Sequence, residues 1–214
     1  MNIPVLVYIT LFTECIVAMW VVYRWRYSTK PQRLISFLII FTAISAIADI
    51  IMAFYNINNL WLGNISNLVE YTIILYVSYL WKSKKISKII LISGITGYSI
   101  LWIISKFTFE PIFMPDSYTS VIAKIIEIIV SALILFDVLQ DTDIKLKNDV
   151  RLWFSSGVII YSSGTLFLFG LFNMMLDTSP ELIRTLWPIN WILSIVYILL
   201  LARGVWCRET SKMY

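Results

Sequence analysis

Four carboxylic acids stand inside long apolar stretches of this chain: Glu14, Asp49, Glu70 and Glu127. A charged side chain at the centre of a membrane costs at least about 2.5–3.5 kcal/mol, so such groups face the interior of a helix bundle and mark functional sites. A carboxyl group there can hold a cation, pass a proton or act as a general acid or base. We therefore expect the four residues to line one acidic, ligand-binding cavity.

The three glutamates recur with similar neighbours. An aromatic residue follows each of them nine positions later, at Tyr23, Tyr79 and Phe136. A polar residue follows thirty-five positions later, at Asp49, Ser105 and Ser162. The last apolar stretch has Asn190 in the place that corresponds to the glutamates. This spacing predicts three tandem helical hairpins in one orientation, followed by a seventh helix.

The acids also have candidate partners. Lys124 lies one helical turn before Glu127, so we expect these two residues to form an ion pair. Carboxylates that share a low-dielectric site repel one another, and we expect the others to be protonated or paired with a cation. The predicted ligand-binding set is Glu14, Asp49, Glu70, Glu127, Asn190 and Tyr161. The alternative is that each carboxyl group only makes a contact between helices.

The elements that must position these residues are long apolar segments. The chain of 214 residues is 59% hydrophobic and 14% charged, with a mean hydropathy of +0.82, which is typical of a membrane protein. Apolar stretches recur at 3–23, 34–54, 60–81, 86–104, 120–139, 152–176 and 186–205. Each is close to the roughly 20 residues that a helix needs to cross a bilayer. The sequence predicts an all-α, polytopic seven-helix bundle that forms one transmembrane domain over residues 1–214.

Basic residues predict the orientation of this bundle. When the seven segments alternate in direction, fourteen Lys and Arg residues fall on one side and only Lys106, Lys124 and Arg184 lie towards the other. The positive-inside rule then places the N-terminus outside and the C-terminus in the cytoplasm, in the inner membrane of a bacterium. The cavity would open to the outside. The net charge is +4, but the basic residues cluster in short loops beside apolar segments, where membrane orientation explains them. We therefore expect no nucleic acid as a partner.

Two glycines of the sixth apolar stretch, Gly157 and Gly164, are seven positions apart and share a helix face. Small residues on one face let a neighbouring helix approach closely. We therefore expect tight packing between this helix and a neighbour.

The sequence lacks the residues that several common kinds of catalytic and cofactor site require. The chain contains no histidine, which excludes histidine-based metal centres and catalytic triads. The last apolar stretch has no interior lysine to carry retinal, and no phosphate-binding loop of the Walker type is present. We expect no catalytic residue, no metal and no other cofactor, unless paired carboxyl groups act alone as acid and base.

Four short motifs carry a resemblance to known proteins: Asn67-Leu68-Val69-Glu70, Ile126-Glu127, Trp153-Phe154-x-x-Gly157-x-x-x-Tyr161-x-x-Gly164 and Trp187-x-x-Asn190. In these motifs the chain resembles a group of uncharacterised bacterial seven-transmembrane-helix proteins that often sit in operons with sensor histidine kinases. The resemblance implies an association with signalling and no established biochemical activity.

Together these features favour a receptor-like membrane sensor. We expect it to contact membrane lipid, to hold a ligand in an outward-facing acidic cavity and to signal through a separate cytoplasmic or membrane partner such as a histidine kinase. The first alternative is a cation- or proton-coupled transporter, because the same acids can form an ion path. The second is an intramembrane lipid-modifying enzyme that uses acids such as Asp49 and Glu70.

Overall fold

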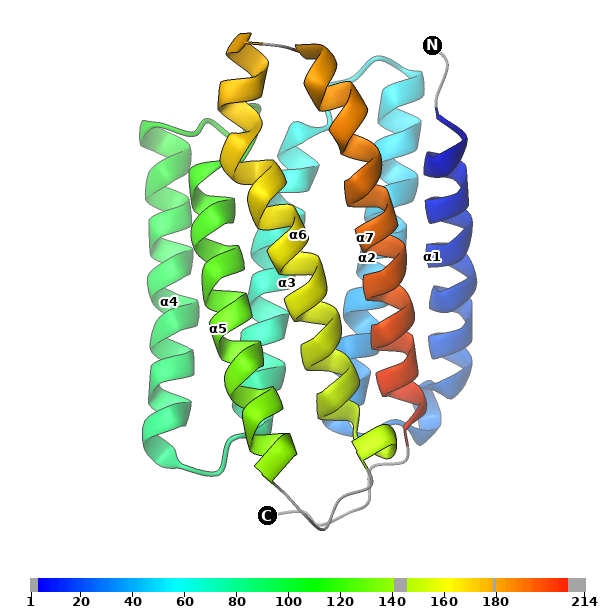
Figure 1. Cartoon of the computed structure of the whole chain (residues 1–214), viewed down its shortest axis with the longest axis vertical. Coiled ribbons are helices and arrows are strands. Elements are labelled where there is room, and N and C mark those ends of the chain that lie inside the picture. The colour runs from blue at the N-terminus through cyan, green and yellow to red at the C-terminus, as the bar shows by residue number, and fades with distance from the viewer. Residues whose placement is uncertain (1–3, 141–145, 179, 208–214) are drawn as a thin grey trace.

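The computed structural model describes residues 4–140, 146–178 and 180–207, and the side chains of these residues except 171–184. Within this part of the chain the secondary structure is entirely helical (Figure 1). The α-helices are α1 (Val5–Arg24), α2 (Lys30–Phe54), α3 (Leu60–Trp81), α4 (Lys85–Thr108), α5 (Tyr118–Gln140), α6 (Val150–Thr178) and α7 (Pro180–Trp206). Two short 3₁₀ helices, η1 (Trp25–Tyr27) and η2 (Leu146–Asn148), precede α2 and α6. Each predicted apolar stretch overlaps one α-helix.

Five segments of the described chain are long and apolar enough to cross a membrane: Val5–Tyr27, Lys30–Phe54, Lys85–Thr108, Val150–Gly170 and Thr185–Trp206. They indicate a helical membrane protein. The other two α-helices, α3 and α5, carry the charged residues Glu70, Lys124 and Glu127 within their length.

The helices form one bundle in which consecutive helices run antiparallel (Figure 1). We call the end where α1, α3, α5 and α7 begin the upper end, and it is drawn at the top of Figure 1. Helix α6 packs most extensively, against α7 on one side and α5 on the other. Helix α7 also packs against α1 and α2 and so closes the bundle, while α4 packs mainly against α3.

Local sequence explains where α2 begins and ends. The backbone N–H of Thr29 donates to Oε1 of Gln32 at 3.0 Å, which satisfies a donor at the start of the helix. Pro31 stands in the first turn, where its missing N–H costs nothing. After the last residue, Asn56 has a φ of 54°. Asparagine adopts this left-handed conformation more readily than most residues, and the chain turns there towards α3.

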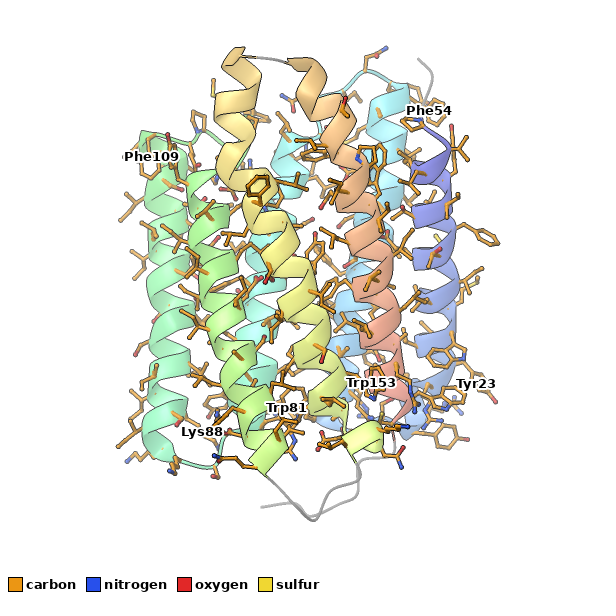
Figure 2. The ribbon with its side chains drawn as sticks, in the orientation of Figure 1. Tyr23, Phe54, Trp81, Lys88, Phe109 and Trp153 are labelled. Carbon is orange, nitrogen blue, oxygen red and sulfur yellow. The ribbon has the colours of Figure 1, made fainter. Side chains whose placement is uncertain are left out.

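An apolar core fills the lower half of the bundle. Val21, Ile39 and Ile74 come from α1, α2 and α3, and they are fully buried together with Val158 of α6 and Ile198 of α7. Large apolar side chains also cover the outer surface, as on α4, where Ile90, Ile100 and Phe107 are exposed. In Figure 2 the labelled Trp81, Lys88 and Trp153 lie near the lower end. An apolar exterior around an apolar core is the pattern of a bundle that is surrounded by lipid.

The expected close packing at the glycines of α6 is present, and the neighbour is α7. A Cβ atom added at Gly157 would lie 3.2 Å from Cβ of Leu200. One added at Gly164 would lie 2.4 Å from Cδ1 of Leu193. The two helices approach this closely because both positions lack a side chain.

Candidate ligand-binding cavity

A cavity of about 650 Å³ opens in the upper half of the bundle. Its lining comes from α1, α2, α3, α6 and α7, together with Pro115 and Asp116 of the loop between α4 and α5. On α1, α3 and α7 the lining extends down to Glu14, Glu70 and Ser194. A volume of this size is within the range of pockets that hold small organic molecules.

The structure brings five of the six predicted ligand-binding residues to this cavity: Glu14, Asp49, Glu70, Tyr161 and Asn190. They come from five different helices and are as much as 176 positions apart (190 − 14) in the sequence. Their role in binding remains a prediction, but their gathering around one cavity is a structural fact.

The glutamates of the repeat stand at matched depth. Glu14, Glu70 and Glu127 follow the first residues of α1, α3 and α5 by nine, ten and nine positions. At about 1.5 Å per residue this is about 14–15 Å along each helix. Asp49 lies five positions before the end of α2, and therefore only about 8 Å from the upper end. The cavity thus carries acids near its mouth and at its floor.

Glu14 is the most deeply buried acid of the lining, with 2% of its surface exposed. The hydroxyl of Ser194 donates to its Oε1 at 2.9 Å. Its other oxygen, Oε2, is buried and receives no hydrogen bond from the described part of the chain. Glu14 therefore links α1 to α7 through one oxygen and keeps the second available.

Asp49 lies nearer the mouth of the cavity. The side-chain amide of Asn59, just before α3, donates to its Oδ1 at 3.2 Å. This contact joins the end of α2 to the start of α3. Asp49 and Asn59 both line the cavity, so the mouth is polar on this side.

Glu70 belongs to a charged network at the floor of the cavity. Nζ of Lys124 lies 3.2 Å from Oε2 of Glu70 and 3.0 Å from Oε2 of Glu127, the partner expected from the sequence. The same ammonium group stands 4.9 Å from the centre of the Tyr161 ring. Lys124 is 1% exposed, so these contacts replace its hydration. The network joins α3, α5 and α6.

Glu127 corrects one expectation. It does not line the cavity within the described part of the chain, although it lies at the same depth as Glu14 and Glu70. Its Oε2 accepts a hydrogen bond of 2.7 Å from the hydroxyl of Ser162, and its side chain is fully buried. The reason is the rotation of α5, which turns this face towards α6. Glu127 reaches the cavity only through Lys124 and Glu70.

The three repeat pairs behave differently in the structure. Ser162 and Glu127 are joined by the hydrogen bond just described. Ser105 instead donates to the backbone oxygen of Trp102 at 2.7 Å. Glu14 and Asp49 line the same cavity, but their hydrogen bonds go to Ser194 and Asn59. The repeat therefore sets depth along the helices and does not produce a common hydrogen-bonding pair.

Sequence reasoning missed part of the mouth. Nζ of Lys106 lies 3.4 Å from Oδ1 of Asp116 and donates to Oδ1 of Asn64 at 3.3 Å. The amide of Asn64 also donates to the backbone oxygens of Ile112 and Met114, at 2.6 and 3.0 Å. These bonds hold the loop between α4 and α5 against α3. One signal was available, because Asn64 and Asn67 precede Glu70 at helical spacing on α3.

Two acids of this loop have shifted pKa values. Burial acts to raise the pKa of Glu110, but hydrogen bonds from Thr119 and from the backbone N–H groups of Tyr118 and Thr119, with the charge of Lys106, lower it below 4.5. Burial raises the pKa of Asp116 above 3.8, despite its hydrogen bond from Thr119 and the nearby Lys106. Asp116, which lines the cavity, therefore takes up a proton more readily than Glu110, which is not part of the described lining.

Aromatic side chains contribute to the walls of the cavity between the acids. Tyr161 is stacked on Tyr197, with 4.6 Å between ring centroids. Trp187 and Phe169 meet edge to face at 6.5 Å, and both line the cavity together with Trp191. The cavity is thus acidic at several points and aromatic between them.

Among the residues that the structure describes, no group of three or more His, Cys, Asp or Glu side chains is placed to hold a metal ion. Comparison with protein-family models, with curated proteins and with solved structures finds no match for this chain. The resemblance to seven-helix proteins associated with histidine kinases therefore stays a prediction.

Proposed function

We propose that the chain is a receptor-like membrane protein of seven spans that binds a ligand in its upper cavity. It passes the binding signal to a separate partner at the other side of the membrane. The observation that carries this proposal is a cavity of about 650 Å³ with polar and aromatic walls that lies above a closed apolar core. A site of this form suits reversible binding of a small molecule.

The orientation follows from the basic residues. The described Lys and Arg residues at or near the lower end are Arg24, Arg26, Lys30, Arg33, Lys82, Lys84, Lys85, Lys88, Lys147, Arg151 and Arg203. Lys106 and Lys124 belong to the upper half. Under the positive-inside rule the lower end faces the cytoplasm of a bacterium and the cavity opens to the outside.

Binding is favoured over transport by what lies below the cavity floor. Val17 and Val21 of α1 follow Glu14, Ile74 and Leu75 of α3 follow Glu70, and each of these apolar side chains is buried. On α7 the floor residue Ser194 is followed by buried Ile198 and Leu201. On these three helices, buried apolar side chains therefore lie below the floor of the cavity.

The charged network offers a route for a signal. Glu70 lines the cavity, Lys124 binds it, and Lys124 also binds Glu127 in the interface between α5 and α6. A ligand that changes the contacts of Glu70 changes the charge balance around Lys124 and hence the fit of α5 against α6. The partner, such as a histidine kinase, would respond to movement of these helices at the basic lower end.

Single cysteine variants test the orientation of the bundle in the membrane and the access to the cavity from outside. Cys15 and Cys207 are first replaced by serine, and Gly63→Cys is then introduced on the cavity lining, where an added Cβ meets no atom within 4 Å. We expect a membrane-impermeant thiol reagent to label this variant in right-side-out vesicles and not in sealed inside-out vesicles. Ser83→Cys, in the exposed connection between α3 and α4, serves as the matched control with the opposite pattern. Labelling of both variants from the same side would refute the proposed topology.

A cation- or proton-coupled transporter is the second candidate, because Glu70, Lys124 and Glu127 form a charged chain within the bundle. Purified protein in proteoliposomes separates the two functions. We expect no accumulation of Na⁺, K⁺ or protons above protein-free vesicles under an imposed gradient. Uptake that is lost in Glu70→Gln would establish transport and overturn the receptor proposal.

A further inference from the structure

Several hydrogen-bond acceptors of the cavity lining have no donor among the described residues. Four buried side-chain atoms of the described lining have no hydrogen-bond partner among the described residues: Oε2 of Glu14, Oε1 of Glu70, Oδ2 of Asp116 and Oδ1 of Asn190. All four are oxygens that accept hydrogen bonds. Glu14 is only 2% exposed, so its free oxygen has little contact with bulk water. The lining therefore complements a molecule that donates hydrogen bonds.

The charge of the lining has one sign. Glu14, Asp49, Glu70 and Asp116 line the cavity, and the described lining contains no Lys or Arg. Lys124 approaches from behind Glu70, but it is shared with Glu127. Lys106 lies 3.4 Å from Oδ1 of Asp116, but it is shared with Glu110. Acids that are gathered in this way repel one another and are stabilised by a positive charge between them. The complementary ligand is a cation.

The size of the cavity and the chemistry of its walls suit an organic molecule better than a bare metal ion. The cavity measures about 650 Å³, and Phe41, Leu60, Phe169 and Trp187 contribute apolar walls. No metal-binding group of three or more His, Cys, Asp or Glu side chains occurs in the described chain. Apolar walls with a few charged groups are typical of sites for organic molecules.

The structure also shows how this site holds an ammonium group. Nζ of Lys124 lies 3.2 Å from Oε2 of Glu70 and 4.9 Å from the centre of the Tyr161 ring. A carboxylate and an aromatic face together are a favourable environment for an ammonium ion. Lys124 occupies only one oxygen of Glu70, and Oε1 meets no hydrogen-bond geometry with the described residues, although the Tyr197 hydroxyl lies near this carboxylate. Tyr161 and Glu70 both belong to the cavity lining.

We infer that the cavity binds an organic cation, with its ammonium group among the acids of the floor and its apolar body against Trp187 and Trp191. The inference rests on the proposed function and names the ligand class of the same cavity. Glu14 and Glu70 stand at matched depth at the floor, while the two tryptophans belong to the upper part of α7. An amphipathic cation would satisfy both the free carboxylate oxygens and the aromatic walls.

Three probes with one apolar body test the charge requirement: 2-phenylethylamine, 2-phenylethanol and 3-phenylpropionate. Their affinities are measured by calorimetry on the full chain in lipid nanodiscs, at neutral pH and fixed salt. We expect the amine to bind at least about tenfold more tightly than the alcohol, and the carboxylate to bind more weakly still. Tetraethylammonium and spermidine extend the series to other organic cations.

Variants then locate the charge. We expect Glu14→Gln and Glu70→Gln each to reduce the preference for amine over alcohol by about tenfold. Asp137→Asn is the control with the same change in net charge, because Asp137 pairs with Lys82 near the lower end of α5 and is half exposed. It should leave the preference unchanged. The ratio of two affinities within one variant is unaffected by a loss of folded protein.

Three outcomes would overturn the inference: equal affinity for the amine and the alcohol, an unchanged preference in both glutamine variants, or no binding of any of the three organic cations. None of these outcomes bears on the labelling of Gly63→Cys from outside or on the absence of ion accumulation. Failure of the ligand class is therefore distinguishable from failure of the receptor function.

Discussion

Lys124 of α5 reaches across the bundle to Glu70 of α3, with 3.2 Å between Nζ and Oε2. This contact connects an acid of the cavity lining to a lysine that is almost completely buried. Since Lys124 also binds Glu127 at 3.0 Å, the cavity floor and the interface between α5 and α6 share one positive charge. The state of the cavity and the packing of these helices are therefore coupled electrostatically.

Removing this lysine should destabilise the bundle strongly. In Lys124→Met, Glu127 and Glu70 lose their cationic partner in a buried site. We expect the free energy of unfolding to fall by about 3–5 kcal/mol, as found when one partner of a buried pair is removed. Unfolding in detergent, followed by circular dichroism, measures the change. The matched control is Lys82→Met, whose partner Asp137 is half exposed, with an expected loss below about 1 kcal/mol. Equal losses in the two variants would contradict the coupling.

The contact between α6 and α7 predicts a position-specific effect of side-chain volume. A Cβ at Gly157 already lies 3.2 Å from Cβ of Leu200, so Gly157→Val must push the helices apart. We expect a loss of about 1–3 kcal/mol in the free energy of unfolding. Gly97→Val on α4 is the control, because an added Cβ there meets no atom within 4 Å. Thermal unfolding of both variants should show a lower midpoint only for Gly157→Val.

The loop between α4 and α5 predicts how stability changes with pH. The folded protein lowers the pKa of Glu110 below 4.5, because the hydrogen bonds from Thr119 and the loop backbone, together with Lys106, outweigh the effect of burial. The unfolded chain therefore binds this proton more tightly, and the stability from Glu110, complete above about pH 4.5, is lost as pH falls through the folded pKa. We expect Glu110→Gln to weaken this loss in acid unfolding curves.

Asp116 provides a control, because its protonation should change the stability with pH in the opposite direction to that of Glu110. Its pKa is raised above 3.8 by burial, so the folded state binds its proton more tightly and gains stability as pH falls towards 3.8. Asp116→Asn removes this gain and should make the acid loss steeper. If Glu110→Gln and Asp116→Asn shift the acid unfolding curve in the same direction, the assignment of these two carboxyl groups is wrong.

Gln32 should stabilise the contact between the start of α2 and the end of α7 at the lower end of the bundle. Its amide nitrogen donates to the backbone oxygen of Cys207 at 2.7 Å, while its Oε1 accepts from the N–H of Thr29. In Gln32→Ala the buried oxygen of Cys207 and the partly buried N–H of Thr29 lose this partner, and we expect the free energy of unfolding to fall by about 1–3 kcal/mol. Hydrogen exchange should then increase in the last turn of α7. Asn58→Ala removes an exposed hydrogen bond to Phe113 at the upper end and should leave α7 unchanged.

The sequence by itself determined the seven helical segments and much of the depth of the acids. An apolar run of about 20 residues is a local signal, and Thr29, Pro31 and Asn56 mark local starts and ends. Glu14, Glu70 and Glu127 stand at similar distances from the starts of their helices because spacing within a helix translates directly into distance along its axis. The pair of Lys124 and Glu127 is equally local, since it spans one turn.

Only the tertiary structure decided how these helices are rotated and which of them are neighbours. That rotation turns Glu14 towards Ser194 of α7 and turns Glu127 away from the cavity towards Ser162. It also brings Lys124 to Glu70, fifty-four positions earlier in the chain. Apolar residues surround most of every helix here, because the outside faces lipid and the inside forms a core. Hydropathy therefore cannot tell one face from another, and packing between helices makes that choice.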